Sequence, residues 1–236
     1  MDPNNPYTIM QQNQYDNDAS YWNVNDKDIV VGSFDLHNNW SDYNDFLFKN
    51  IITAGKIGLD FGCGPGRNIV KFSNSFERID GVDISNINLQ NAQTWINYNN
   101  ILKSSNLIKS NGVDLSSIND NIYDIVFSTI CLQHICVHDI RYNLMQEFFR
   151  VLKPGGNICI QMGYGSGNPR TSSYFDNYYD CEGTNGFFDV RIDSISDLQT
   201  DIENIGFINF DYDIRPVGPG DNHGNWIFFR AQKPQI

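Results

Sequence analysis

The sequence has little positive charge. Its 16 lysine and arginine residues stand against 28 aspartate and glutamate residues, which gives a formal net charge of −12 at pH 7. Such a chain has no long-range attraction for phosphate backbones or anionic lipids, so we expect no binding to nucleic acid or membranes. No apolar run reaches the roughly 20 residues of a membrane-spanning helix, and the N-terminus lacks the basic start and apolar core of a secretory signal. These absences favour a cytoplasmic protein.

Cysteine spacings typical of metal or redox sites are also missing. The 5 cysteines include no C-x-x-C pair and no His/Cys spacing of the zinc-binding kind. We therefore expect reduced thiols. Cys131 and Cys159 lie within apolar runs, where a small buried side chain is the usual role, and Cys63 lies in a glycine-rich turn. No motif in the sequence predicts a metal site.

From residue 56 onward, strand and helix patterns alternate. Short apolar runs typical of buried strands alternate with amphipathic stretches, of which the helical stretch before KPGG is stopped by its proline and glycines. The five expected strands lie at residues 56–62, 78–85, 106–112, 122–130 and 157–164. The alternation predicts a doubly wound, mostly parallel α/β sheet that binds ligands beyond the carboxyl ends of its strands.

The two ends of the chain depart from this alternation. The segment at about 163–192 has the length of a further strand–helix unit without its pattern, which is typical of a lid. After a helix at 194–207, we expect two strands, 208–216 and 225–233, to form an antiparallel hairpin that completes a seven-stranded sheet.

Residues 1–55 show no sustained periodicity. We expect a loose tail, a short strand and a helix near residues 41–50. This segment would form an N-terminal arm that contributes to the substrate site, and residues 56–236 would form one domain with the lid-like insert.

The stretch LDFGCGPG places Gly62, Gly64 and Gly66 directly after the first expected strand. Glycine permits positive φ and close approach of a ligand to the backbone, as in nucleotide-binding turns. A dinucleotide fold would need its third glycine at position 67, where this chain has Arg67. The spacing G-x-G-x-G, followed by Asp83 at the end of the second strand, instead resembles the class I S-adenosylmethionine-dependent methyltransferases.

The resemblance extends over residues 56–164 and includes GVDIS, NGVDLSSI, YDIVFSTICLQHI and RVLKPGGNICI. It implies a Rossmann-like methyltransferase fold, S-adenosylmethionine as cofactor and a small-molecule substrate. The residues that it assigns to the cofactor are Asp60, Gly62, Gly64, Gly66, Asp83, Ile84, Asp114, Leu115 and Ser128.

The resemblance also implies how these residues act. Asp60 would brace the glycine loop and face the amino group of the cofactor, and Asp83 would accept hydrogen bonds from both ribose hydroxyls. Asp114 and the amide of Leu115 would meet the adenine ring, with a simple helix cap as the alternative for Asp114. The backbone carbonyl of Ser128 would hold the methionine ammonium.

Methyl transfer to a hydroxyl needs a base, and the chain has 4 histidines. His134 follows the fourth strand, where members of the family place residues that face the methyl group. His223 lies in the expected hairpin turn and is the second candidate; a structural role stays open for both. No Asn-Pro-Pro-type motif for base methylation and no carboxylates for a metal follow the fourth strand.

Aromatic residues of the two irregular segments are candidates for substrate contacts, with the edge of the core as the alternative. They are Trp22, Trp40, Tyr43, Tyr174, Phe175, Tyr178 and Tyr179. The expected reaction is O-methylation of a saccharide or natural-product hydroxyl. The alternatives are a nicotinamide-dependent sugar-nucleotide enzyme and a non-catalytic cofactor-binding protein. Nothing in the sequence indicates the oligomeric state.

Overall fold

The computed structural model describes residues 2–23, 43–101, 103, 105–165, 190–217 and 223–235. Seven strands form one sheet in the order β3-β2-β1-β4-β5-β7-β6. Their bounds are β1 Ile57–Phe61, β2 Arg78–Asp83, β3 Leu107–Lys109, β4 Tyr123–Ser128, β5 Leu152–Tyr164, β6 Ile208–Pro216 and β7 Asn225–Gln232. The first five strands pair in parallel, and β7 lies antiparallel between β5 and β6. The doubly wound sheet and the C-terminal hairpin are therefore confirmed.

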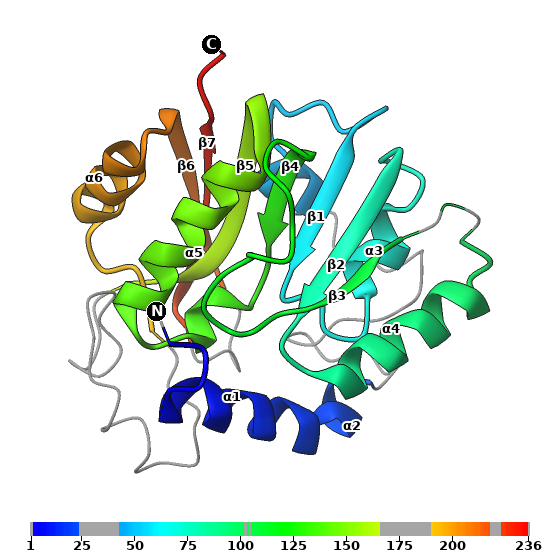
Figure 1. Cartoon of the computed structure of the whole chain (residues 1–236). Coiled ribbons are helices and arrows are strands. Elements are labelled where there is room, and N and C mark those ends of the chain that lie inside the picture. The colour runs from blue at the N-terminus through cyan, green and yellow to red at the C-terminus, as the bar shows by residue number, and fades with distance from the viewer. Residues whose placement is uncertain are drawn as a thin grey trace.

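Helices cover both faces of this sheet (Figure 1). The helices are α1 Pro6–Asn17, α2 Ala19–Trp22, α3 Arg67–Phe72, α4 Asn86–Tyr98, α5 His138–Val151 and α6 Ile195–Ile205, with a π-helix at Tyr43–Leu47 and a 3-10 turn at Leu132–His134. Neighbouring strand residues point to opposite faces, so Val126 joins the core under α5 and α6 whereas Phe127 joins the core under α3 and the π-helix. The site described below lies at the ends of the strands, between these two layers.

Helix ends follow local signals. Asn5 caps α1 by accepting from the Thr8 amide, and Pro6 begins that helix, where its missing N–H costs nothing. Ser85 caps α4 in the same way, which fixes the start of that helix directly after β2. Gly206 ends α6 with φ of 112°, a conformation that glycine adopts without strain.

The expected loose N-terminal tail is wrong, because Pro6–Asn17 forms helix α1. Its buried residues are Tyr7, Thr8 and Gln11, and a helix with so little apolar surface has no periodicity to detect. The helix expected near residues 41–50 corresponds to the π-helix Tyr43–Leu47. The expected short strand falls in 24–42 and most of the expected lid in 166–189, both outside the described residues.

The expectation of five reduced cysteines is wrong at Cys136, which is disulfide-bonded. Cys63, Cys131 and Cys159 are free. Cysteine spacing alone could not reveal this bond, because pairing depends on which cysteines the fold brings together. None of the described helices combines the length and the apolar character needed to cross a membrane.

Candidate active site

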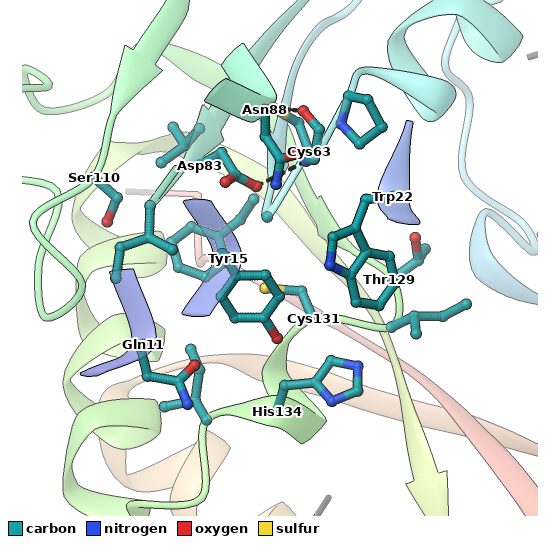
Figure 2. Close-up of a pocket in the computed structure, with 18 of the residues that line it drawn as sticks. Gln11, Tyr15, Trp22, Cys63, Asp83, Asn88, Ser110, Thr129, Cys131 and His134 are labelled. Carbon is teal, nitrogen blue, oxygen red and sulfur yellow. Dashed lines mark hydrogen bonds between the residues drawn. The ribbon is translucent and has the colours of Figure 1, made fainter. Parts of the chain in front are cut away.

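A pocket lies at the carboxyl ends of β1, β2 and β4 (Figure 2). Helix α1 runs across this edge of the sheet (Figure 1). Its cavity measures about 150 Å³. Three parts of the chain form the walls: the glycine loop with the end of β2, the turn that follows β4, and the helices α1 and α2. Ligands of doubly wound sheets bind at this edge, so the pocket lies where the topology predicts a site.

The glycine loop follows β1 with positive φ at Gly62, Gly64 and Gly66, at 73°, 51° and 87°. A Cβ on Gly62 would lie 2.1 Å from the sulfur of Cys131, so only glycine lets this loop pack against the turn after β4. A Cβ on Gly64 would meet no atom within 4 Å, and this residue lines the pocket. The backbone at Gly64 is therefore open to close approach by a ligand.

Asp83 ends β2 and joins the glycine loop to the start of α4. One carboxylate oxygen accepts from the Gly64 amide at 2.8 Å and the other from the Ser85 amide at 2.8 Å. Burial raises the pKa of Asp83, while the hydrogen bonds from Ser85, Gly64 and Asn88 lower it. Figure 2 shows this carboxylate beside Asn88 and Cys63 on the pocket wall. Three donors leave at least one lone pair of this carboxylate that a hydroxyl ligand could use.

Asp60 lies in β1 directly before the pocket-lining residues Phe61 and Gly62; it has no exposed surface and is not itself among the lining residues. Within the described segments, neither of its carboxylate oxygens accepts a hydrogen bond of normal geometry. Burial raises the pKa of Asp60 to about 8; the Asn68 amide lowers it in part and the Asp83 carboxylate raises it further. A carboxyl in these surroundings is neutral at pH 7 and would ionise on the arrival of a cation.

The predicted adenine contacts are not brought to the pocket. The Asp114 carboxylate accepts from the Asn111 side chain and the Ser116 amide, and the Leu115 amide donates to Glu147 at 2.9 Å. Neither Asp114 nor Leu115 is among the pocket-lining residues.

Other residues line this part of the pocket. Ser110 and Gly112 lie there beside Ile84, which the sequence did predict. The Ser110 hydroxyl accepts from the Gly112 amide at 2.9 Å, which fixes a tight bend just after β3. Their position directly after a strand was a signal that could have identified them.

The turn after β4 forms the opposite wall. The Ser128 hydroxyl donates to the Phe61 carbonyl at 2.8 Å and joins β4 to β1, while Thr129, Ile130 and Cys131 line the pocket. The side chain of Ser128 therefore has a structural contact, and the predicted role of its backbone carbonyl stays a prediction.

Of the two candidate bases, the structure brings His134 to the pocket. The His134 ring lies 6.3 Å from the ring of Trp22, and its backbone carbonyl accepts from the Tyr7 hydroxyl at 3.2 Å. His223 is not among the lining residues. It is buried between Gln133, 3.2 Å from its Nε2, and Gly163, where a Cβ would lie 2.2 Å from its Nδ1. This packing supports a structural role for His223.

The aromatic candidates for substrate contacts include one residue that lines the pocket. Trp22 lines it, whereas the side chains of Trp40, Tyr43, Tyr174, Phe175, Tyr178 and Tyr179 lie outside the described residues. The sequence interpretation missed the contribution of α1, which supplies Tyr7, Thr8, Gln11 and Tyr15. The Asn-Pro pair at its start was the available signal.

Two cationic residues, Arg67 and Lys71, also line the pocket, from helix α3. Arg67 donates to the Trp22 carbonyl and so links α3 to α2. In the described parts of the chain, no group of three or more His, Cys, Asp or Glu side chains has a geometry that could hold a metal ion.

Residues 59–160 match the family model described as a methyltransferase domain. The chain is 28% identical over 158 residues to phosphoethanolamine N-methyltransferase 2 of Caenorhabditis elegans, covering 66% of this chain and 33% of the relative. It is 28% identical over 125 residues to O-methyltransferase rstn1 of Aspergillus nomiae, and this match covers 51% of this chain and 54% of the relative. The chain therefore spans about a third to a half of the length of these curated relatives.

Two solved structures share the fold. Phosphoethanolamine N-methyltransferase 2 of Haemonchus contortus, in complex with phosphomonomethylethanolamine and S-adenosylhomocysteine, has a TM-score of 0.63 and 19% identity, covering 84% of this chain and 54% of that chain. The [4+2]-cyclase SpnF has a TM-score of 0.66 and 16% identity, and the match covers 98% of this chain and 97% of SpnF. The fold alone therefore does not determine the reaction.

The family match and the pocket decide between the cofactors. The match is to a methyltransferase domain, which excludes the nicotinamide-dependent alternative, and it contains the glycine loop and Asp83. In the pocket these parts form one wall, where the Gly64 amide donates to Asp83 at 2.8 Å and the backbone of Gly64 is open to the cavity. Residues 59–160 therefore form a methyltransferase domain with the fold of the class I S-adenosylmethionine-dependent methyltransferases, and the family match and the ligand-bound neighbour support S-adenosylmethionine as the cofactor.

Proposed function

We propose that the chain transfers the methyl group of S-adenosylmethionine to a hydroxyl of a small molecule, of the saccharide or natural-product type. The observation that carries this proposal is the position of His134, together with Tyr15 and Trp22, in the pocket that contains Asp83. Aromatic side chains bind flat ligand faces, and a histidine in such surroundings can take the proton of a hydroxyl.

The arrangement of the pocket supports a direction for the cofactor. With its ribose at Asp83, the cofactor would extend along the open backbone of Gly64 toward the turn after β4. Figure 2 shows Cys131 and His134 on the side of the pocket away from Ser110. The acceptor would then enter between this turn and helix α1, where Tyr15 and Trp22 limit access of water.

Methyl transfer is an in-line displacement at the sulfonium carbon, so the protein contributes mainly alignment and exclusion of water. The acceptor oxygen forms its bond to the methyl carbon as the carbon–sulfur bond breaks, and the cofactor leaves as neutral thioether. The hydroxyl proton goes to the imidazole of His134.

A second candidate is N-methylation of an amine that carries an anionic group. It is favoured by Arg67 and Lys71, which give one wall of the pocket a positive charge in a protein of net charge −12. The similarity to phosphoethanolamine N-methyltransferase 2 agrees with such an acceptor. A neutral amine attacks without a base, so this reaction would depend little on His134.

The test is product formation from methyl-labelled S-adenosylmethionine with fractionated small-molecule extract and with a panel of sugars, phenols and phosphorylated amines. A labelled ether supports O-methylation, and a labelled phosphorylated amine supports the second candidate. Tight binding of S-adenosylhomocysteine without any labelled product across extract and panel would contradict both and favour the non-catalytic interpretation.

The His134→Ala variant separates the two reactions. O-methylation should lose about 100- to 10,000-fold in kcat, with cofactor affinity nearly unchanged. His138→Ala is the matched control, because His138 pairs with Asp201 of α6 at 2.8 Å and does not line this pocket. Full activity of His134→Ala on a hydroxyl acceptor would refute the role of His134 as the base.

A further inference from the structure

Ile130, in the turn after β4, has an unusual backbone conformation. Its φ is 53°, and every other non-glycine residue with positive φ in the described part of the chain is an asparagine. Asparagine tolerates this left-handed region, whereas a β-branched side chain there is strained. Strain of this kind persists only where surrounding contacts hold it, and it is concentrated at functional sites.

The contact that holds Ile130 comes from a neighbouring strand. The side-chain oxygen of Gln161, in β5, accepts a hydrogen bond from the Ile130 amide at 2.7 Å. Gln161 has no exposed surface, and among the described residues its side-chain nitrogen has no hydrogen-bond partner. A buried, half-satisfied amide on an interior strand is costly for folding, so an apolar residue would serve stability better.

The turn held by Gln161 forms one wall of the cofactor pocket. Thr129, Ile130 and Cys131 all line it. The Asn68 side chain donates to the Thr129 hydroxyl at 2.9 Å, and the sulfur of Cys131 lies against the backbone of Gly62. A change in the backbone at Ile130 would therefore move both this wall and the glycine loop.

We propose that Gln161 is a positioning residue, which holds Ile130 in its left-handed conformation and thereby keeps the turn 129–131 in the geometry that the cofactor requires. Two costly features, a strained backbone and a buried amide, meet in a single hydrogen bond at the pocket. The role concerns the cofactor site and is independent of which acceptor is methylated.

The test measures the affinity for S-adenosylhomocysteine by calorimetry, with Gln161→Leu in two backgrounds. In the native background, loss of the acceptor leaves the Ile130 amide unpaired and should weaken binding about tenfold. Glycine adopts positive φ without strain, so in the Ile130→Gly background the same change should have an effect of about twofold or less.

Cys159→Ala is the control for a general disturbance of β5. Cys159 is buried two residues away in the same strand and does not line the pocket. This variant should lower the melting temperature while leaving the affinity for S-adenosylhomocysteine unchanged.

Two results would overturn the proposal. One is a folded Gln161→Leu protein with native affinity. The other is a loss of about tenfold that persists in the Ile130→Gly background, because Gln161 would then act by another route. If Gln161→Leu alone does not fold, the double variant Gln161→Leu/Ile130→Gly decides. A double variant that folds and binds S-adenosylhomocysteine as tightly as Ile130→Gly supports the proposal. A double variant that does not fold, or that binds about tenfold more weakly than Ile130→Gly, refutes it.

Discussion

Binding of the cofactor should release a proton from Asp60. Burial raises the pKa of this carboxyl to about 8, with a smaller lowering by Asn68 and a further rise from Asp83. A group with a pKa of about 8 is about 90% protonated at pH 7. S-adenosylmethionine carries a sulfonium and an ammonium group, and nearby cations favour the ionised form of a carboxyl. The proton should therefore leave when the cofactor binds with its ammonium group next to Asp60, as the family resemblance implies.

The size of the effect follows from the shifted pKa. When Asp60 is ionised in the bound complex over the whole pH range, the affinity for S-adenosylmethionine should rise about 25-fold between pH 6.5 and 8.5 and level off above pH 9. Calorimetry at pH 7 in buffers of different ionisation enthalpy should report about 0.9 protons released for each cofactor bound. The Asp60→Asn variant keeps the shape of the side chain, so its affinity should be nearly independent of pH.

Without cofactor, the contribution of Asp60 to the free energy of unfolding should fall as the pH rises, whereas the affinity for the cofactor rises. In the unfolded chain Asp60 ionises above its ordinary pKa of 3.8, whereas in the folded chain it stays protonated up to about pH 8. The unfolded state therefore binds fewer protons between these values, and the contribution of Asp60 to stability falls as pH rises through them. In urea denaturation, the free energy of unfolding of Asp60→Asn should lack this fall with pH. Equal proton release by the native protein and Asp60→Asn, or none by the native protein, would refute the assignment.

Three further perturbations test the pocket. Asp83→Ala should weaken binding of S-adenosylhomocysteine by about 1.5–3 kcal/mol, because charge-assisted hydrogen bonds are lost, whereas Asp114→Ala should leave it unchanged; equal losses would contradict the positions of the two carboxylates. Gly62→Ala should destabilise the protein by at least about 2 kcal/mol in urea denaturation, since its Cβ would lie 2.1 Å from the Cys131 sulfur. A stability equal to that of the native protein would show that this contact is absent. Tyr7→Phe should lower the free energy of unfolding by about 1–3 kcal/mol, because the Cys136 amide donates to the Tyr7 hydroxyl at 2.8 Å and would lose this partner. The same change at Tyr21, 52% exposed, is the control, and equal effects would refute that reasoning.

The sheet and the cofactor loop were predictable because they depend on short-range patterns. The glycine loop follows its strand directly, and Asp83 ends the next strand, so parallel topology alone brings Gly64 and Asp83 to the same edge. The hairpin was predictable for a similar reason, because the turn-rich segment between its strands indicates an antiparallel return.

Residues in irregular segments were harder to predict. Whether Asp114 or Ser110 faces the pocket depends on local hydrogen bonds, since Asn111 accepts from the Val113 and Asp114 amides and so orients the whole bend. His223 was expected at the rim, but its ring fills the space above Gly163, a contact between distant segments that no local pattern encodes. Helix α1 was not predicted because polar contacts rather than an apolar stripe attach it.

These polar contacts of α1 have a consequence for the order in which the protein folds. The Tyr7 hydroxyl bonds the backbone of His134 and Cys136, which follow it by 127 and 129 residues, and Asp16 accepts from Ser85, which lies 69 residues further on. A twelve-residue helix is marginal on its own, so α1 depends on such tertiary partners for its stability. At a synthesis rate of about 5–20 residues per second, residue 136 is made about 6 to 26 seconds after Tyr7. The wall of the cofactor site that α1 forms therefore assembles only after β1, β2 and β4, the strands that carry the site, have been synthesised.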